Sequence, residues 1–332
     1  MQPPFNPIIT NPQTTSLTGV RTLVVGLGRF GGGVGVTQWL VRQGAIVTVT
    51  DQANASSLRE SLEAIADLPV TLCLEGHDAC DLPQTDLVII NPAVHKSTSG
   101  LFREILHRKI PWTTEINLFC ERCLAPVVGV TGSFGKSTTS AMLAHVFEKC
   151  RLDGGAKFTG VHLGGNIGRS LLAELPNIQS TDLVVLEMSN AQLEDIDRVD
   201  WVPAVAVITN LFPHHLDRYE NFGAYVQAKL NLVRAGSASC PVVFGEMDPL
   251  AWRLLEEAVG EETARLAPVA RIEPPIELLV PGRHNQVNAA CAMTVCRVMG
   301  LDQGNVRESL KTFRGLPHRL ELVAEVGGVE YI

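Results

Sequence analysis

Residues 129–139 combine glycines, a lysine and hydroxyl side chains in an order typical of a phosphate-binding loop. The sequence there reads Gly129-Val-Thr-Gly132-Ser133-Phe134-Gly135-Lys136-Ser137-Thr138-Thr139. Glycines let backbone N–H groups approach phosphate oxygens, and a helix N-terminus adds donors and partial positive charge. The lysine can reach the β- and γ-phosphates, and the first serine hydroxyl can hold Mg²⁺. The chain is therefore predicted to bind a nucleoside triphosphate, with ATP as the expected one.

The loop departs from the strict pattern G-x-x-x-x-G-K-[ST], which would require glycine where Val130 stands. The alternative is a glycine-rich turn with an exposed lysine. A β-branched run before the loop and a helical pattern after it favour phosphate binding.

A second glycine cluster, Gly26-Leu-Gly28-Arg29-Phe30-Gly31, follows a short apolar run near the start of the chain. The next apolar run ends at Asp51. This arrangement fits a dinucleotide fingerprint with its acidic ribose partner, although a structural glycine turn would look the same. Such a turn predicts a nucleotide-like phosphate nearby without saying which nucleotide.

Four further residues could serve a metal or phosphate. Glu187 directly follows an apolar run at 183–186. In proteins with a phosphate loop, a carboxylate at such a position downstream of the loop can bind the metal ion. His214 and His215 follow the run 204–208, and Lys229 lies within a helical pattern. Parallel strands would bring Glu187 and the histidines to one sheet edge. On these residues alone, a surface lysine and a loop histidine are open alternatives.

The composition limits the class of protein. Hydrophobic residues make up 45% of the 332 residues and charged residues 19%, which is ordinary for a globular protein of two domains. A net charge of −8 counts against a nucleic-acid partner. No apolar run is long enough for a membrane span, and the N-terminus lacks the features of a signal peptide. A cytoplasmic protein is expected.

The apolar pattern predicts two consecutive α/β domains, each with a parallel sheet covered on both faces. A first Rossmann-like domain is expected over 1–123 and a central phosphate-loop domain over 124–319, with a linker near 122–126. The expected strands are 20–25, 46–50, 70–74, 87–90, 127–130, 183–186, 204–208 and 242–244. The expected helices are 34–42, 56–66, 100–108, 115–120, 137–149, 222–235, 284–299 and 306–312.

Two smaller features complete the pattern. Cys120 and Cys123 have zinc-like spacing, but no second pair follows at a usual distance, so reduced thiols are expected. Residues 320–325 and 329–332 are predicted to form a hairpin. Because domains rarely end on an apolar strand, the natural chain is expected to continue, with 320–332 leading toward a further domain.

Taken in order, the segments resemble the Mur ligase family, and within it the members that add D-glutamate. The matching pieces are the first glycine turn, 91–94, 129–139, 164–168, 187–193, 215–218 with Lys229, 282–285 with Asn288, and 315–321. The last piece, Gly-Leu-Pro-His-Arg319-Leu-Glu, is the most specific for those members.

The resemblance implies an ATP-dependent ligase of peptidoglycan precursor synthesis. ATP would phosphorylate the alanyl carboxylate of UDP-N-acetylmuramoyl-L-alanine, and the amine of D-glutamate would displace phosphate from the acyl phosphate. The family has three domains, of which the third holds the incoming amino acid. These 332 residues are thus expected to bind nucleotides without full turnover, as a monomer.

The resemblance also implies residue roles. Mg²⁺ ions, two in number, would be bound by Ser137, Glu187, His215 and Lys229, the lysine as its carbamate. The catalytic set would be Lys136, Glu187, His215 and Lys229. ATP contacts would come from the loop residues Gly132, Ser133, Phe134, Gly135, Lys136, Ser137, Thr138 and Thr139, with Asn288 at adenine and Arg319, supported by His318, at the phosphates. The UDP-substrate would meet Gly28, Arg29, Phe30, Asp51, Asn166 and Gln192.

Some positions depart from the family pattern. Asn190 and Ala191 stand in place of the usual Ser-Phe, His214 precedes His215, and Phe30 precedes an unusual run of three glycines. These changes bear on the uracil and sugar contacts. The alternatives are a nicotinamide-dependent oxidoreductase, which leaves 129–139 unexplained, a non-catalytic nucleotide-binding module, and a family member that adds a different amino acid.

Overall fold

The computed structural model of this chain describes residues 16–29, 31–77, 82–167, 170–316, 324–326 and 329–331. The chain forms two compact units. The first holds the described residues up to Cys123 together with 170–177 and Asp195–Trp201. The second holds Leu124–Ile167, Ile178–Glu194 and the described residues from Val202 onward. The two short segments of the first unit come from the sequence that was expected to lie in the central domain.

The first unit is built on a parallel five-stranded sheet with the order β3-β2-β1-β4-β5. Its strands are β1 (Arg21–Val25), β2 (Ile46–Thr50), β3 (Val70–Cys73), β4 (Leu87–Ile90) and β5 (Trp112–Thr113). Its helices are α1 (Gly32–Arg42), α2 (Arg59–Glu63), α3 (Gly100–His107) and α4 (Glu115–Arg122).

Every residue of β4 is buried. Parallel strands need both faces of their sheet shielded from water, and the helices of this unit provide that cover. Phe102 and Ile105 of α3 pack with Leu23, Val25 and Val88 in one apolar cluster. Helix α1 packs on β1 and β2, and the 3₁₀ helices Leu172–Asn177 and Ile196–Arg198 pack on α4.

The second unit has a parallel six-stranded sheet with the order β11-β10-β9-β6-β8-β7. Its strands are β6 (Val127–Thr131), β7 (Val161–Gly165), β8 (Leu183–Glu187), β9 (Val205–Ile208), β10 (Val242–Phe244) and β11 (Leu266–Pro268). Strand β6 lies between β8 and β9, so the loop that follows β6 emerges between the ends of those two strands.

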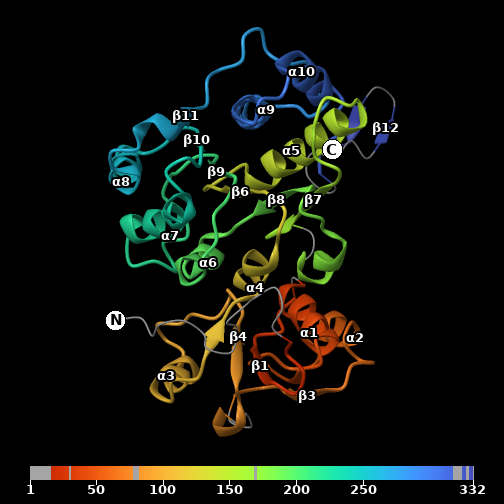
Figure 1. Ribbon diagram of the computed structural model, residues 1–332, viewed down its shortest axis with the longest axis vertical. Helices are drawn as coiled ribbons and strands as arrows, with labels where there is room; N and C mark the ends of the chain where they lie inside the picture. The colour runs from red at the N-terminus through yellow and green to blue at the C-terminus, as the bar shows by residue number, and fades with distance from the viewer. Residues whose placement is uncertain are drawn as a thin grey trace. The chain divides into compact units, whose positions relative to one another are not determined.

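Six α-helices lie in the described part of the second unit (Figure 1). They are α5 (Lys136–Leu152), α6 (Asn190–Leu193), α7 (Phe222–Ala235), α8 (Pro249–Val259), α9 (Arg283–Val298) and α10 (Gln303–Lys311). Helix α5 packs on β7 and β8 and also on α9 and α10, while α7 packs with α6 and α8. Small residues of α9 such as Ala289 and Ala292 are buried in the same apolar cluster as Met142 and Phe147 of α5. Each buried large apolar side chain contributes about 1.5–3 kcal/mol.

The predicted fold class is confirmed, because both sheets are parallel and covered by helices. Helix 222–235 and strand 242–244 have the predicted limits, whereas α5 is longer than expected and α2 shorter. The predicted linker overlaps α4, which continues to Arg122. The hairpin is confirmed by the antiparallel pair β12 (Ala324–Val326) and β13 (Val329–Tyr331).

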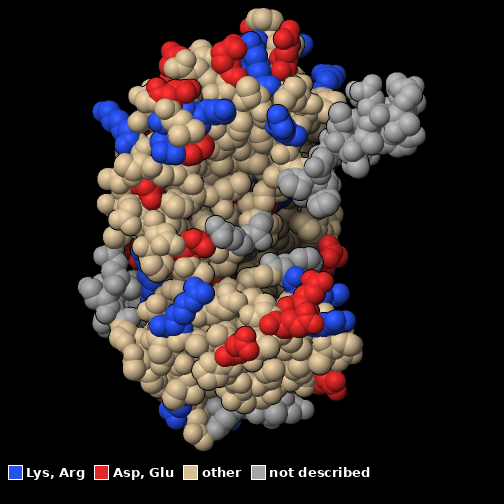
Figure 2. Space-filling model, turned by 90° about the vertical axis from the view of Figure 1, so that its right-hand side faces the viewer, with Lys and Arg blue, Asp and Glu red and all other residues tan. Residues whose placement is uncertain are grey.

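Several elements were not predicted, namely β5, β7, α6, α8 and β11. Strands β5, β7 and β11 are short or rich in glycine, which removes the alternating pattern that marks a strand. Helix α8 did carry a signal, since Asp248 caps it and Pro249 is its first residue. No helix of the described ranges is long and apolar enough to cross a membrane. On the face drawn in Figure 2, basic and acidic side chains of the described residues are intermixed.

Candidate functional site

Two glycines of the loop after β6 lie where no other residue fits. Gly132 has φ +147° and Gly135, which precedes α5, has φ +78°. A Cβ on Gly132 would lie 2.0 Å from Oγ1 of Thr209, and one on Gly135 would lie 2.3 Å from Oδ1 of Asn288. The loop is therefore packed tightly between the end of β9 and the start of α9, with backbone in the left-handed region.

Hydrogen bonds from the segment after β9 hold the loop in place. The Ser133 N–H donates to the Asn210 carbonyl at 2.9 Å, and the Phe134 N–H donates to Oδ1 of Asn210 at 2.9 Å. The Phe134 carbonyl accepts from Oγ1 of Thr209 at 2.6 Å. Oγ of Ser133 contacts both the N–H and the carbonyl of Phe212. No role was predicted for Asn210 from the sequence, although it is a polar residue just past β9, the strand next to β6.

Lys136 begins α5 and crosses the loop. Its Nζ donates to the carbonyls of Gly132 at 3.0 Å and Ser133 at 3.1 Å. Ser137 and Thr138 are partly buried at the N-terminus of the same helix, and Thr139 is buried, with Oγ1 donating to Oδ1 of Asn288 at 3.4 Å. The structure thus brings the predicted ATP residues of the loop together with Asn288 of α9.

Glu187 ends β8 and is only 1% exposed. Its Oε1 accepts a hydrogen bond from Nδ2 of Asn166 at 3.1 Å, whereas its Oε2 is buried and has no partner among the described residues. A buried carboxylate oxygen without a partner is costly, so this atom is suited to a cation or a donor from a ligand.

Lys229 of α7 is buried, with 1% of its surface exposed, so the alternative of a surface lysine is wrong. Nζ donates to Oγ1 of Thr131 at 3.3 Å and lies 5.0 Å from the centre of the Tyr225 ring. Burial holds the pKa of Lys229 well below its usual range, and the charge of Lys136 lowers it further, while Glu187 acts in the opposite direction. Helix α7 therefore presents an amine that loses its proton readily beside the phosphate loop.

His215 is exposed and has φ +53°, in the left-handed region. Its ring lies 4.0 Å from that of His214, centre to centre. Desolvation lowers the pKa of His215, and the charge of His214 lowers it further, while Asp217 acts in the opposite direction. Lys229 and Lys136 make smaller lowering contributions to this pKa. The charges of both lysines thus act on His215 in the direction that favours its neutral form.

The four predicted catalytic residues are thus electrostatically connected. The predicted metal ligands come from separate elements. Ser137 lies in α5 and Glu187 ends β8. His215 lies in the segment after β9, and Lys229 belongs to α7. Within the described ranges, no three His, Cys, Asp or Glu side chains converge as a metal cluster. The predicted ligand set contains only two residues of those types, and the unpartnered Glu187 oxygen is the atom that fits a divalent cation.

The first glycine turn is closed by Asp51. The Gly28 N–H donates to Oδ2 of Asp51 at 3.0 Å, and the Ala53 N–H donates to Oδ1 at 2.9 Å. Oγ of Ser61 donates to the Gly28 carbonyl at 2.6 Å. Asp51 therefore supports the turn in this structure, while Arg29 is exposed next to it.

The other residues predicted for the UDP-substrate have separate positions. Asn166 contacts Glu187, as described above. Gln192 belongs to a capping box, in which its Oε1 accepts from the Ser189 N–H at 2.9 Å and its own N–H donates to Oγ of Ser189. Phe30, His318 and Arg319 lie outside the described residues.

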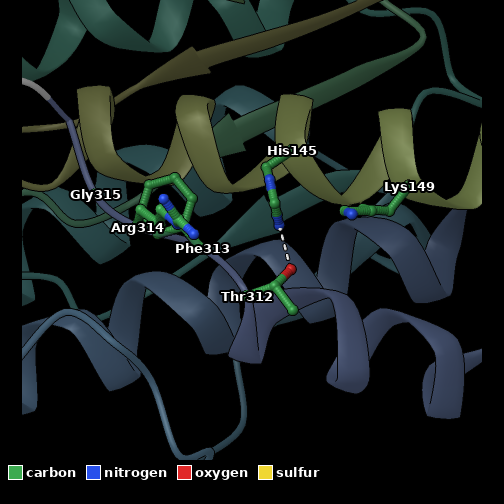
Figure 3. Close-up of a pocket in the computed structure, with 6 residues that line it drawn as sticks. All are labelled: His145, Lys149, Thr312, Phe313, Arg314 and Gly315. Carbon is green, nitrogen blue, oxygen red and sulfur yellow. Dashed lines mark hydrogen bonds between the residues drawn. The ribbon is translucent and has the colours of Figure 1, made fainter.

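A cavity of about 420 Å³ lies elsewhere in the second unit, between α5 and the end of α10 (Figure 3). In it, Nε2 of His145 contacts Oγ1 of Thr312 at 2.8 Å. Its lining contains none of the residues predicted to bind ATP, and consists of His145, Lys149, Thr312, Phe313, Arg314 and Gly315.

The cysteine pair of α4 carries no disulfide. Cys120 is buried and Cys123 partly buried, and neither forms a disulfide. Burial raises the pKa of the Cys120 thiol well above its usual value, which keeps it protonated and unreactive.

Two family models match the chain. The model described as "Mur ligase MurD-like, N-terminal domain" matches residues 20–110, and the one described as "Mur ligase middle domain" matches residues 130–264. The second match includes most of the phosphate loop, Glu187, His215 and Lys229. The alternative of a nicotinamide-dependent oxidoreductase left residues 129–139 unexplained, and this family model covers all of them except Gly129.

Relatives and solved structures agree with these matches. The UDP-N-acetylmuramoylalanine--D-glutamate ligase of Roseiflexus sp. (strain RS-1) is 32% identical over 95% of this chain and 72% of its own length. The enzyme of that name from Geotalea uraniireducens (strain Rf4) is 33% identical over 95% of this chain and 71% of its own length. In fold, the chain is similar to a crystal structure of UDP-N-acetylmuramate:L-alanyl-gamma-D-glutamyl-meso-diaminopimelate ligase from Neisseria meningitides. That likeness has a TM-score of 0.62 and 21% identity, and covers 91% of this chain and 100% of the other. With a MurD-like first unit and a Mur ligase middle unit, the chain belongs to the Mur ligase family.

Proposed function

We propose that this chain serves an ATP-dependent ligase reaction in which D-glutamate is joined to UDP-N-acetylmuramoyl-L-alanine. The observation that carries the proposal is the placement of Glu187, Lys229 and His215 around the phosphate loop of β6. The relatives that cover 95% of the chain are named for this reaction. The first unit would hold the UDP end of the substrate, and the second would hold ATP.

The phosphate loop supplies donors for the ATP phosphates. The N–H groups of the loop, the N-terminus of α5 and Nζ of Lys136 would contact phosphate oxygens. Lys136 would exchange its two carbonyl partners in the loop for those oxygens. Asn288, next to Gly135 and Thr139, would contact adenine, and Arg319 would contact the phosphates.

Mg²⁺ fits the acidic side of this site. Oε2 of Glu187 and the hydroxyl of Ser137 are hard oxygen ligands for one ion. A second ion would use His215 and the carbamate of Lys229. The lowered pKa of Lys229 supports this role, because only an unprotonated amine adds CO₂ and so becomes an anionic oxygen ligand. When bound, Mg²⁺ would neutralise charge on the transferring phosphoryl group.

The chemistry then follows from position. The alanyl carboxylate attacks the γ-phosphorus of ATP, and ADP leaves as the acyl phosphate forms. The amine of D-glutamate attacks the acyl carbon, loses a proton, and inorganic phosphate leaves. Holding the carboxylate against the γ-phosphate can supply roughly 7–11 kcal/mol of the barrier reduction.

Hydroxylamine tests the first step of this reaction, because it replaces the amine of D-glutamate and captures an acyl phosphate as a hydroxamate. The protein is incubated with ATP, Mg²⁺, hydroxylamine and UDP-N-acetylmuramoyl-L-alanine, and products are identified by mass spectrometry. The expected product is the hydroxamate of the alanyl carboxylate, formed only with both ATP and Mg²⁺. A protein that binds both substrates and forms no hydroxamate would instead be a nucleotide-binding module.

A further inference from the structure

A polar network connects the two chain segments that carry Glu187 and His215. Glu187 is the last residue of β8 and His215 follows β9, and these two strands lie on opposite sides of β6. The sheet fixes Glu187 through its pairing with Val130 of β6, but it does not reach His215, which lies beyond the end of β9. Beyond the strand ends, the two segments meet through the side chains of Asn190, Glu194, Arg218 and Tyr219.

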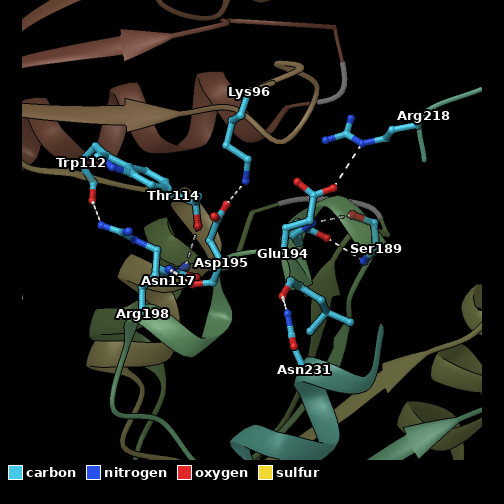
Figure 4. A network of polar contacts seen from close by, with 12 residues as sticks. Lys96, Trp112, Thr114, Asn117, Ser189, Glu194, Asp195, Arg198, Arg218 and Asn231 are labelled. Carbon is cyan, nitrogen blue, oxygen red and sulfur yellow. Dashed lines mark hydrogen bonds and ion pairs between the residues drawn. The ribbon is translucent and has the colours of Figure 1, made fainter. Parts of the chain in front are cut away.

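Tyr219 is the centre of this network. Its hydroxyl donates to Oε1 of Glu194 at 2.7 Å and accepts from Nδ2 of Asn190 at 2.7 Å. Nε of Arg218 lies 3.4 Å from the same Glu194 oxygen, and Figure 4 shows this arginine reaching toward Glu194. Asn190 is 7% exposed, so its contact with Tyr219 is shielded from water.

The network acts directly on the backbone of His215. The N–H groups of Arg218 and Tyr219 donate to the His215 carbonyl at 3.1 and 3.3 Å. This turn holds His215 at φ +53°, which a non-glycine residue adopts only when its surroundings enforce it. A displacement of Tyr219 would therefore displace His215.

The short helix α6, which begins with Asn190, also contacts α7, the helix that carries Lys229. Nδ2 of Asn231 in α7 donates to the carbonyl of Leu193 in α6 at 3.0 Å (Figure 4). Helix α6 begins three residues after Glu187, and a capping box of Ser189 and Gln192 caps its N-terminus. The segment of Glu187 thus leads directly into α6, and the segments of His215 and Lys229 are hydrogen-bonded to residues of α6.

We propose that the Tyr219–Glu194 pair is a positioning device, which fixes His215 relative to Glu187 so that both can serve one Mg²⁺–ATP complex. This inference rests on the metal roles proposed above for Glu187 and His215. Neither Tyr219 nor Glu194 is expected to touch the substrates. Their effect is transmitted through the turn of His215 and through α6.

The test uses Mn²⁺ as a probe, because free Mn²⁺ is counted by its electron paramagnetic resonance signal. Binding of Mn²⁺ is measured in the presence of a non-hydrolysable ATP analogue for Tyr219→Phe, which removes one hydroxyl and keeps the ring. We expect about tenfold weaker Mn²⁺ binding, the lower end of the range for residues that orient metal ligands. The unfolding midpoint without metal should fall only as far as the loss of the two hydrogen bonds of this hydroxyl requires, and analogue binding without metal should stay unchanged.

Matched variants separate positioning from general damage. Ser309→Ala removes a hydroxyl that donates to the Asn305 carbonyl in α10, and it should bind Mn²⁺ like the wild type. Glu194→Ala should weaken Mn²⁺ binding as Tyr219→Phe does, and the double variant should be no weaker than either single one. Glu194→Gln keeps an acceptor for Tyr219 and should restore most of the affinity.

The outcomes distinguish the two proposals. If Glu187→Gln loses Mn²⁺ while Tyr219→Phe binds it like Ser309→Ala, the positioning role is wrong and the metal site stands. If Glu187→Gln binds Mn²⁺ like the wild type, the metal site itself is wrong. Should Tyr219→Phe fail to fold, Asn190→Ala, which removes the donor to the Tyr219 hydroxyl, gives the same comparison, and wild-type affinity there overturns the inference.

Discussion

Nδ2 of Asn166 donates to Oε1 of Glu187 at 3.1 Å and so orients a buried carboxylate whose other oxygen has no partner among the described residues. Removing the charge should therefore leave folding intact and abolish binding of the Mg²⁺ ion that Glu187 is proposed to hold. In Glu187→Gln we expect an unchanged or higher unfolding midpoint without ligand, because an incompletely partnered buried charge is removed. The stabilisation that Mg²⁺ adds to that of ATP should disappear.

Thermal unfolding with ATP alone, Mg²⁺ alone and both measures this difference. Glu63→Gln, at an exposed ion pair with Arg59, is the matched control. A Glu187→Gln protein that still gains stability from Mg²⁺ in the presence of ATP would contradict the assignment.

Gly135→Ala should weaken ATP binding by more than backbone strain explains. The added Cβ would lie 2.3 Å from Oδ1 of Asn288, so Asn288 must move away from its place beside Thr139. Gly154→Ala is the control, since Gly154 has φ +70° and open space around its Cβ position.

Both substitutions should cost about 1–2 kcal/mol in the free energy of unfolding for the left-handed conformation. Only Gly135→Ala should reduce ATP affinity, by about tenfold, in a calorimetric titration. Equal ATP affinities in the two variants would show that the loop does not depend on its packing against α9.

Lys229 should form a carbamate. Burial and the charge of Lys136 hold its pKa well below the usual range, so more of the amine is unprotonated at neutral pH than for an exposed lysine. With ¹³C-labelled bicarbonate, carbon NMR should show one carbamate signal in the wild type. The signal should be absent in Lys229→Ala and present in Lys149→Ala, whose lysine is exposed on α5. A signal that survives Lys229→Ala would refute the assignment.

Glu115 should make the first unit less stable as pH rises. Burial raises the pKa of this carboxyl from 4.5 to about 7, although Ser170 donates a hydrogen bond to it. Between these values the folded chain holds a proton that the unfolded chain has released, so the free energy of unfolding falls with rising pH. Above about pH 7 the full penalty applies, about 3 kcal/mol at most.

Glu115→Gln keeps an acceptor for Ser170 and carries no charge at any pH. Its unfolding midpoint should therefore exceed that of the wild type at pH 8 and approach it near pH 4.5. Glu63→Gln should follow the wild-type curve, because Glu63 is exposed. Parallel curves for Glu115→Gln and the wild type between pH 4.5 and 8 would show that Glu115 is not protonated in the folded state.

The phosphate loop was predictable because its signal is local. Strand, glycines, lysine and helix follow one another without a break, and each residue type has its own reason to be there. The parallel sheets were predictable for the same reason, since buried strands alternate with helices along the chain. Glu187 was placed correctly at a strand end, next to the loop strand in the sheet.

What depends on contacts across the fold could not be predicted. Lys229 looks like a surface residue of α7 until the helix is packed against Thr131 of β6. Asp51 was expected to face a ribose, yet both its oxygens accept backbone N–H groups in and beside the glycine turn. Tyr219 carries no signal at all in the sequence, because its partners Asn190 and Glu194 lie more than twenty residues away.

Calorimetric titration of the chain with Mg²⁺–ATP analogue and with UDP-N-acetylmuramoyl-L-alanine tests the central claim most directly. The wild type should bind both. Lys136→Ala should lose about 10–100-fold in affinity for the nucleotide, as expected when charge-assisted hydrogen bonds worth about 1.5–3 kcal/mol are removed, and keep its affinity for the UDP precursor. Lys149→Ala, on the same helix, should bind both like the wild type. Equal nucleotide affinity in Lys136→Ala and the wild type, or no binding of the UDP precursor, would contradict the proposed reaction.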